Sequence, residues 1–221
     1  MIPLRDSVAT RRVPVVNYAL IALCALAFLA ELRAGPQLDA LIQRYALIPA
    51  HFTALSERIG FWSPEAILPL FSSMFLHAGL LHFGGNMLFL WIFGDNVEDR
   101  FGHLGYALFY LAGGAAAGVS HVLSDPGSIA PTIGASGAVA AVMGAYFMLH
   151  PGARIQSLLL IGFFVTTASV PAVIYLALWF GMQVLMGATG AQEGVAWWAH
   201  AGGFAFGCLA VVLLGRRSRH G

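Results

Sequence analysis

The sequence predicts an all-α protein, a polytopic membrane protein whose six transmembrane helices form a bundle. Hydrophobic residues make up 59% of the 221 residues and charged residues only 10%. A soluble domain averages about 25% charged residues, so this chain could not cover a water-exposed surface with charge. Several uncharged runs are also close to the length of about 20 residues that a spanning helix needs. The net charge of +1 gives no argument for a nucleic-acid partner.

The first helix is expected over residues 13–30, an uncharged run that follows three arginines. The apolar core of a secretory signal peptide has about 7 to 15 residues, and this run is longer, so we expect it to be retained. Residues 31–65 mix charges, prolines and aromatic residues. That mixture predicts a structured loop with one or two short amphipathic helices.

The second to fourth helices follow from the next uncharged runs. Residues 66–94 carry no charge, which is enough chain for a re-entrant segment and a second helix. The stretch "GDNVEDRFG" that ends this run is expected to be a charged turn containing Glu98. A third helix is expected over 104–123 and a fourth over 134–149.

The run from 155 to 192 is too long for one helix. Its 38 residues would span roughly 57 Å at 1.5 Å per residue, against a hydrocarbon core of about 30 Å. We therefore expect an apolar connecting loop and then a fifth helix over 170–187, with Pro171 in its first turn. A sixth helix is expected over 196–214. Five spans is the alternative, if the fourth or fifth helix is misjudged.

The positions of the arginines predict the orientation. With six spans, the side that holds both termini collects Arg5, Arg11, Arg12, Arg100, Arg154, Arg216, Arg217 and Arg219, and the other side has Arg33, Arg44 and Arg58. Positive charge favours the cytoplasmic side. We expect a cytoplasmic segment over 1–12, a membrane domain over 13–215 with an extracytoplasmic loop at 31–65, and a cytoplasmic tail over 216–221. The protein would then lie in the inner membrane of the cell.

Polar side chains gather at the outer ends of the second, fourth and sixth helices, which run in the same direction. They are His82 and Asn86, then Ser136, then His200. Polar groups inside a membrane are costly and are usually functional. At 1.5 Å per residue these groups would lie roughly 5 to 10 Å below the outer surface. The nearby His77 is expected to bond loop backbone instead.

Small residues recur every four positions on two of these helices, at Ser136, Ala140 and Gly144 and at Ala199, Gly203 and Gly207. Such stripes let helix backbones approach closely in lipid. If the two stripes face each other, His200 can take the proton of Ser136 and make its hydroxyl a nucleophile. Since no acidic residue is expected at that depth, we predict a Ser–His dyad and not a triad.

An oxyanion formed at Ser136 would need hydrogen-bond donors. Backbone N–H groups at the start of the fourth helix, including that of Ser136, have no partner within the helix. The Asn86 amide and the His82 imidazole could add two more donors. Asn86 as a link between helices, His82 as a structural residue and Ser136 as a packing residue are the alternatives.

Three motifs, taken together, resemble the rhomboid intramembrane serine proteases of bacteria. They are His82-x-x-x-Asn86, Gly134-x-Ser136-Gly137 and Ala199-His200-x-x-Gly203-x-x-x-Gly207, within a match over about residues 66–210. The resemblance implies a six-helix bundle of rhomboid type with no metal or other cofactor. Its substrates would be single-span membrane proteins, cut in or near the transmembrane segment.

The resemblance also implies a role for each matched residue. Ser136 would be the nucleophile, His200 the general base and acid, and His82 and Asn86 would stabilise the oxyanion. The matched glycines would serve packing: Gly134, Gly137, Gly203 and Gly207. Some members of the family stack an aromatic ring on the histidine from one turn after the serine, where this chain has Ala140.

Other functions fit less well. A non-catalytic rhomboid-like protein that binds transmembrane clients would be marked by loss of the serine or the histidine, and both are present. A transporter would need a polar path across the whole bilayer. A zinc protease would need a motif such as HExxH, and a soluble-type hydrolase would need GxSxG, neither of which occurs.

Overall fold

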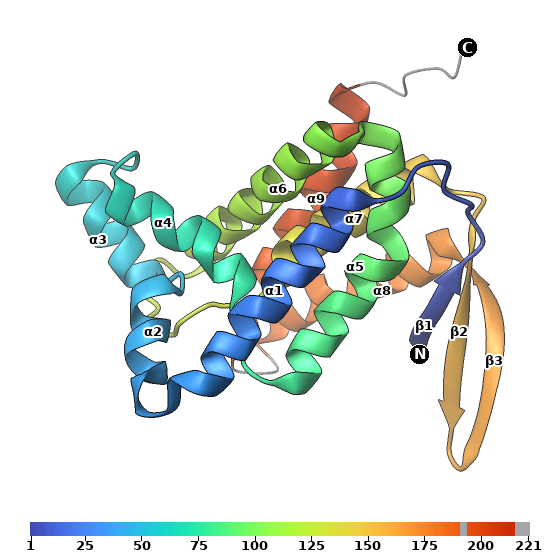
Figure 1. Ribbon diagram of the computed structural model, residues 1–221, viewed down its shortest axis with the longest axis horizontal. Helices are drawn as coiled ribbons and strands as arrows, with labels where there is room; N and C mark the ends of the chain where they lie inside the picture. Colours follow the sequence, from blue (N-terminus) through green and yellow to red (C-terminus); the bar gives the residue numbers. More distant parts are fainter. Residues whose placement is uncertain (191–193, 215–221) are drawn as a thin grey trace.

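The computed structural model describes residues 1–190 and 194–214 as a helical bundle with a small β-sheet at one side (Figure 1). The expected cytoplasmic tail lies outside these residues. The six longest described helices are α1 (Val15–Ala34), α5 (Leu80–Phe101), α6 (His103–Ser124), α7 (Ser136–Leu149), α8 (Ala172–Thr189) and α9 (Trp197–Leu213). The predicted helical class is confirmed, and most predicted helix ends agree with the observed ones within a few residues.

Three helical segments in the described part of the chain are long and apolar enough to cross a membrane. They are Val15–Tyr45, His103–Ser124 and Ala172–Thr189, and a fourth arises if Pro64–Phe75 and Leu80–Phe101, bent by 86°, form one broken span. The apolar helices α7 and α9 are shorter, with 14 and 17 residues. The chain is therefore a multi-pass membrane protein, and its six spans stay a prediction.

The first loop, over 31–65, contains two short helices, as the sequence predicted. It holds η1 (Gly35–Gln37), α2 (Leu38–Tyr45) and α3 (Pro49–Ile59), whereas α4 (Pro64–Ser72) and η2 (Ser73–Phe75) precede α5 in the run where a re-entrant segment was expected. Between α2 and α3, Leu47 exchanges two backbone hydrogen bonds with Thr132, of 3.0 and 2.8 Å. Leu47 is also part of a small core with Phe52 and Leu70. The loop is thereby fixed to the segment that leads into α7.

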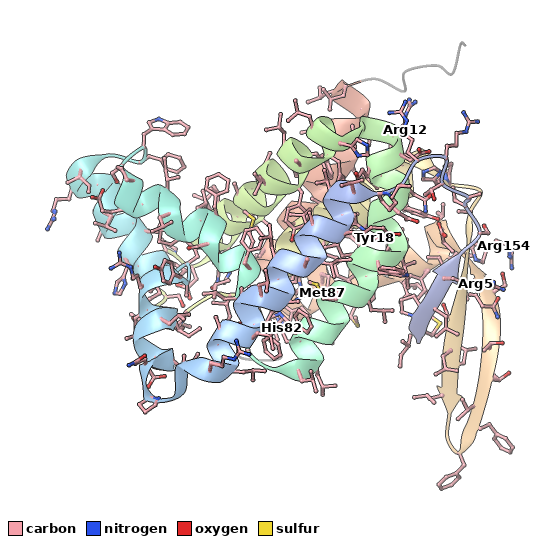
Figure 2. The ribbon with its side chains drawn as sticks, viewed as in Figure 1. Arg5, Arg12, Tyr18, His82, Met87 and Arg154 are labelled. Atoms are coloured by element: carbon pink, nitrogen blue, oxygen red, sulfur yellow. The ribbon has the colours of Figure 1, made fainter. Side chains whose placement is uncertain are left out.

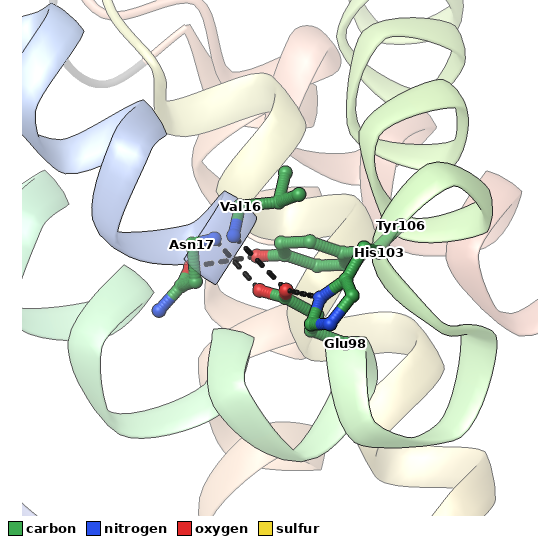
Figure 3. A network of polar contacts seen from close by, with 5 residues as sticks. All are labelled: Val16, Asn17, Glu98, His103 and Tyr106. Carbon is green, nitrogen blue, oxygen red and sulfur yellow. Dashed lines mark hydrogen bonds and ion pairs between the residues drawn. The ribbon is translucent and has the colours of Figure 1, made fainter. Parts of the chain in front are cut away.

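The stretch expected to be a charged turn is the last part of α5, so that prediction is wrong for Glu98. Its carboxylate is buried, at 1% exposed, and accepts the N–H groups of Val16 at 3.0 Å and Asn17 at 2.7 Å (Figure 3). These are unpaired donors in the first turn of α1, where a negative charge is stabilising. His103 at the start of α6 pairs with the same carboxylate.

Asn17 extends this network into the bundle. Its amide nitrogen donates to the carbonyl of Leu90 at 3.0 Å, and its amide oxygen accepts from the Tyr106 hydroxyl at 2.8 Å. A side chain at Gly94 would collide with the Asn17 amide. The hydrogen bonds of Glu98 and Asn17 therefore join α1, α5 and α6 at one end of the bundle.

The apolar connection before α8 is not a loop. It forms β2 (Arg154–Ile161) and β3 (Phe164–Pro171), which pair antiparallel, and β1 (Ile2–Asp6) adds to β2. Strand pairing satisfies backbone groups that a loop would leave open, and β-branched residues in "FVTTASV" favour it. Arg5 and Arg154 lie on this sheet, on the same side of the molecule as Arg12 (Figure 2).

The centre of the bundle is α7, which contacts α5, α6 and α9 and is buried from Gly137 to Tyr146. Its contact with α9 is a contact of backbones. A Cβ atom at Gly203 would collide with the carbonyl oxygen of Gly137, and one at Gly207 would collide with that of Ala141. The predicted close packing of small residues is confirmed.

The substitution Gly207→Ala is expected to lower stability by about 1–3 kcal/mol, because the added methyl group overpacks a rigid backbone contact. The measurement is thermal unfolding of the detergent-purified protein. Gly181→Ala on α8 is the matched control, since its Cβ would meet open space. An equal loss of stability in both variants would show that the α7–α9 contact is not tight.

Candidate active site

Ser136 and His200 meet between α7 and α9. The Oγ atom of Ser136 lies 2.8 Å from Nε2 of His200, within hydrogen-bonding distance. Ser136 is the first residue of α7, and His200 lies one turn into α9. The two side chains are half-buried. The facing small-residue stripes thus place a hydroxyl and an imidazole together, as the sequence predicted.

A glycine shapes the turn that presents Ser136. Gly134 has a φ of +126°, which is a backbone conformation that other residues rarely adopt. Its N–H donates to the carbonyl of Ser73 at 2.9 Å, which ties this turn to η2. Gly137 serves packing, because a Cβ atom there would lie 2.6 Å from Cβ of Ala117 on α6. The hydrogen bond of Gly134 and the packing of Gly137 therefore hold the start of α7 in place, with Ser136 at its N-terminus.

The His200 ring is held by a residue that the sequence reasoning missed. Nδ1 of His200 lies 2.8 Å from Oε1 of Gln183, a buried amide on α8. The rings of Trp179 and Trp197 are each 6.1 Å from the imidazole, measured between centroids. The His200 ring therefore has one hydrogen-bond partner at Nδ1 and two indole rings near it. The signal that could have found Gln183 is a lone amide in the C-terminal half of an apolar helix.

His82 lies beside the serine, near the start of α5. Its Nδ1 accepts the N–H of Ala78 at 3.3 Å, so in the neutral ring Nε2 carries the proton. That Nε2 atom is directed at the Ser136 turn, because a Cβ atom at Gly134 would lie 2.6 Å from it. His82 is therefore a hydrogen-bond donor aimed at the region around Ser136.

Asn86 follows one turn later on α5. It is buried, and its amide nitrogen has no hydrogen-bond partner. An unpaired buried donor is costly unless a partner arrives later. Asn86 therefore offers a free donor on the same helix as His82.

The segment that positions His82 is fixed by a buried carboxylate near the C-terminal end of α1. Glu31 accepts the backbone N–H of His77 through both carboxylate oxygens, at 3.0 and 3.1 Å. The His77 side chain bonds the carbonyl of Phe75 at 3.1 Å, the structural role expected for it. Its ring packs on that of His82 with centroids 5.4 Å apart. No group of three or more metal-ligating side chains was found in the described part of the chain.

The comparisons with known proteins agree in family. The family model described as "Rhomboid domain" matches residues 64–217. Rhomboid protease GluP of Bacillus subtilis is 30% identical over 146 residues, which are 66% of this chain and 26% of that protein. RHOMBOID-like protein 12, mitochondrial, of Arabidopsis thaliana is 30% identical over 158 residues, which are 64% of this chain and 44% of that protein.

A third relative matches over a shorter stretch. RHOMBOID-like protein 6, mitochondrial, of Arabidopsis thaliana is 40% identical over 76 residues, which are 34% of this chain and 24% of that protein. The chain therefore covers less than half the length of each of these three relatives.

The geometry predicts that Ser136 reacts with a fluorophosphonate. The Oγ–P bond forms, fluoride leaves, and His200 accepts the serine proton. Mass spectrometry of the labelled, detergent-purified protein should find the phosphonyl group on Ser136, and Ser136→Ala and His200→Ala should remain unlabelled. His51→Ala, at an exposed histidine of α3, is the control and should label like the wild type. Labelling that persists in His200→Ala would contradict the assigned pair.

Proposed function

The chain belongs to the rhomboid family, and on that premise we propose that it is an intramembrane serine endopeptidase. Its substrates would be single-span membrane proteins, cut in or near the transmembrane segment close to the extracytoplasmic face. The observation that carries the proposal is the 2.8 Å contact between Ser136 Oγ and His200 Nε2. A packing serine needs no base at that distance.

Peptide cleavage follows from this pair in two stages. Ser136 Oγ attacks the scissile carbonyl carbon while His200 Nε2 takes the hydroxyl proton. The C–N bond then breaks, and His200 returns the proton to the departing amine. A water molecule, activated in the same way by His200, hydrolyses the acyl-enzyme and releases Ser136. No cofactor enters this sequence of steps.

Three kinds of donor support an oxyanion site beside Ser136. The Nε2–H of His82 is aimed at the Gly134–Ser136 turn, and the Asn86 amide nitrogen has no other partner. The backbone N–H of Ser136 lies before the first bond of α7, which Val139 donates to Ala135 at 2.9 Å. Fixed donors of this kind act where the negative charge develops and need no reorganisation during the reaction.

The length of α7 supports a site below the membrane surface. Its 14 residues rise only about 21 Å, whereas the hydrocarbon core is about 30 Å thick. If α7 ends at the inner surface, Ser136 lies several ångströms inside the outer one. Arg12 and His82 lie at opposite ends of the bundle, as this orientation requires (Figure 2).

The proposed topology places each segment on the side of the membrane that the sequence predicted. Residues 1–12 and 216–221 lie in the cytoplasm, 13–215 form a six-helix domain in the inner membrane, and the loop over 31–65 is extracytoplasmic. Because β1 forms part of a sheet with β2 and β3, that sheet also lies on the cytoplasmic side. The bilayer and single-span substrates are the proposed partners.

The proposal is tested by cleavage of a single-span reporter protein in proteoliposomes. The wild type should cut the reporter in or near its transmembrane segment, and Ser136→Ala should not cut it. Asn86→Ala should slow cleavage by about 10²-fold or more, the effect of one lost oxyanion donor. The rate is read from product bands over time, and the cut site by mass spectrometry.

Two controls make this test decisive. His51→Ala should cleave at the wild-type rate, and the thermal midpoint of Asn86→Ala should stay close to that of the wild type. Cleavage by Ser136→Ala, or a folded wild type that binds the reporter and leaves it intact, would overturn the proposal. The latter result would favour a non-catalytic protein that binds transmembrane clients.

A further inference from the structure

Gln183 on α8 is a buried polar side chain in contact with His200. Only 3% of its surface is exposed, and Oε1 lies 2.8 Å from Nδ1 of His200. Its nitrogen, Nε2, donates to the carbonyl oxygen of Trp179, one turn earlier on the same helix, at 3.2 Å. Both ends of the amide are therefore bonded.

The contact with Trp179 determines which way the amide points. A backbone carbonyl can only accept a hydrogen bond, so the NH₂ group of Gln183 must face it. The reverse orientation would put two oxygens together and leave the NH₂ group facing the imidazole. Amide orientations are assigned from such networks, and here the network allows only one. The oxygen of Gln183 therefore faces His200.

This orientation selects the tautomer of His200. An amide oxygen accepts hydrogen bonds and does not donate them, so Nδ1 of His200 must carry a proton. In the neutral ring Nε2 then has the free lone pair, and Nε2 is the atom 2.8 Å from Ser136 Oγ. The carbonyl of Trp179, the Gln183 amide, His200 and Ser136 form one directed chain of hydrogen bonds.

We propose that Gln183 is the positioning residue of the active site, a neutral third member that holds His200 in its reactive tautomer. This inference rests on the proposed function. When His200 takes the serine proton, the ring becomes an imidazolium, and the dipole of the Gln183 oxygen stabilises it at Nδ1. A neutral amide does this at lower desolvation cost than a buried carboxylate.

The position of Gln183 gives α8 a part in the reaction. Ser136 and His200 are on α7 and α9, whereas Gln183 is on α8, which packs mainly against α9. Many apolar side chains of α8 face outward, among them Ile174, Leu178, Met182 and Leu185. The hydrogen bond to His200 exists only while α8 packs against α9. The reactive tautomer of His200 therefore depends on that packing.

Other charges near His200 must be considered in any test that changes pH. In the described part of the chain, the ionisable side chains whose charge would act on it are His82 on α5 and His121 on α6. Both are imidazoles, and both are the same in every Gln183 variant. A change in pH dependence between those variants therefore reports on residue 183.

The test compares Gln183→Leu and Gln183→Glu in the reporter cleavage assay, with kcat, KM and the pH–rate profile measured for each. Gln183→Leu removes the acceptor, so kcat should fall roughly tenfold, about the effect of one neutral hydrogen bond, with KM little changed. Gln183→Glu keeps an acceptor oxygen for Nδ1 but loses the donor to the Trp179 carbonyl, so its kcat should fall less than that of Gln183→Leu.

The position of the acid limb of the pH–rate profile distinguishes the two roles, because a residue that only packs would not change it. An acceptor at Nδ1 favours the protonated imidazole, so the limb should move to lower pH in Gln183→Leu. A carboxylate there favours it more strongly, so the limb should move to higher pH in Gln183→Glu. Met182→Leu, at an exposed neighbour on α8, is the control and should match the wild type in both kcat and profile.

The outcomes separate this inference from the proposed function. A wild type that neither cleaves the reporter nor reacts with the fluorophosphonate would overturn the proposed function itself. An active wild type with unchanged kcat and pH profile in Gln183→Leu would overturn only the role of Gln183. Equal losses of kcat in both variants, with lower thermal midpoints, would show a structural amide and would also overturn it.

Discussion

The close approach of α7 and α9 is the constraint on which the candidate site depends. Gly203 and Gly207 face carbonyl oxygens of α7 with no room for a Cβ atom. Lipid tails are as apolar as the helices, so the helices associate through this tight packing and not through the hydrophobic effect. Ser136 and His200 each lie within the first turns of their helix. The backbone contact therefore holds the two side chains at their 2.8 Å separation.

Buried polar groups elsewhere in the bundle serve to fix backbone and side-chain positions. Glu98 satisfies the first turn of α1, Glu31 holds the segment before α5, and Gln183 bonds both the α8 backbone and His200. Each is paired, as a polar group in an apolar surrounding must be. Other buried polar atoms of the described residues have no hydrogen-bond partner, among them the hydroxyl of Tyr110 and the amide nitrogen of Asn86. In the proposed reaction, the Asn86 amide would find its partner in the substrate.

The parts of this arrangement that the sequence predicted are those with a periodic signal. Apolar runs gave the helices, and four-residue spacing of small residues gave the α7–α9 contact. Gln183 has no periodic signal. The role of a single amide in an apolar helix depends on the side chain that it meets on a neighbouring helix. The buried position of Glu98 has no local sequence signal, because the backbone N–H groups that it accepts from lie more than 80 positions away. Hydropathy alone also does not distinguish the paired strands β2 and β3 from an apolar loop.

The central claim is that Ser136, His200 and the donors on α5 form one reactive site. A crystal structure of the protein after reaction with a fluorophosphonate tests it most directly. The account predicts phosphorus bonded to Oγ of Ser136, with a phosphonyl oxygen within hydrogen-bonding distance of Nε2 of His82 and the Asn86 amide nitrogen. A phosphonyl group on another residue, or one whose oxygens point away from these donors, would contradict it.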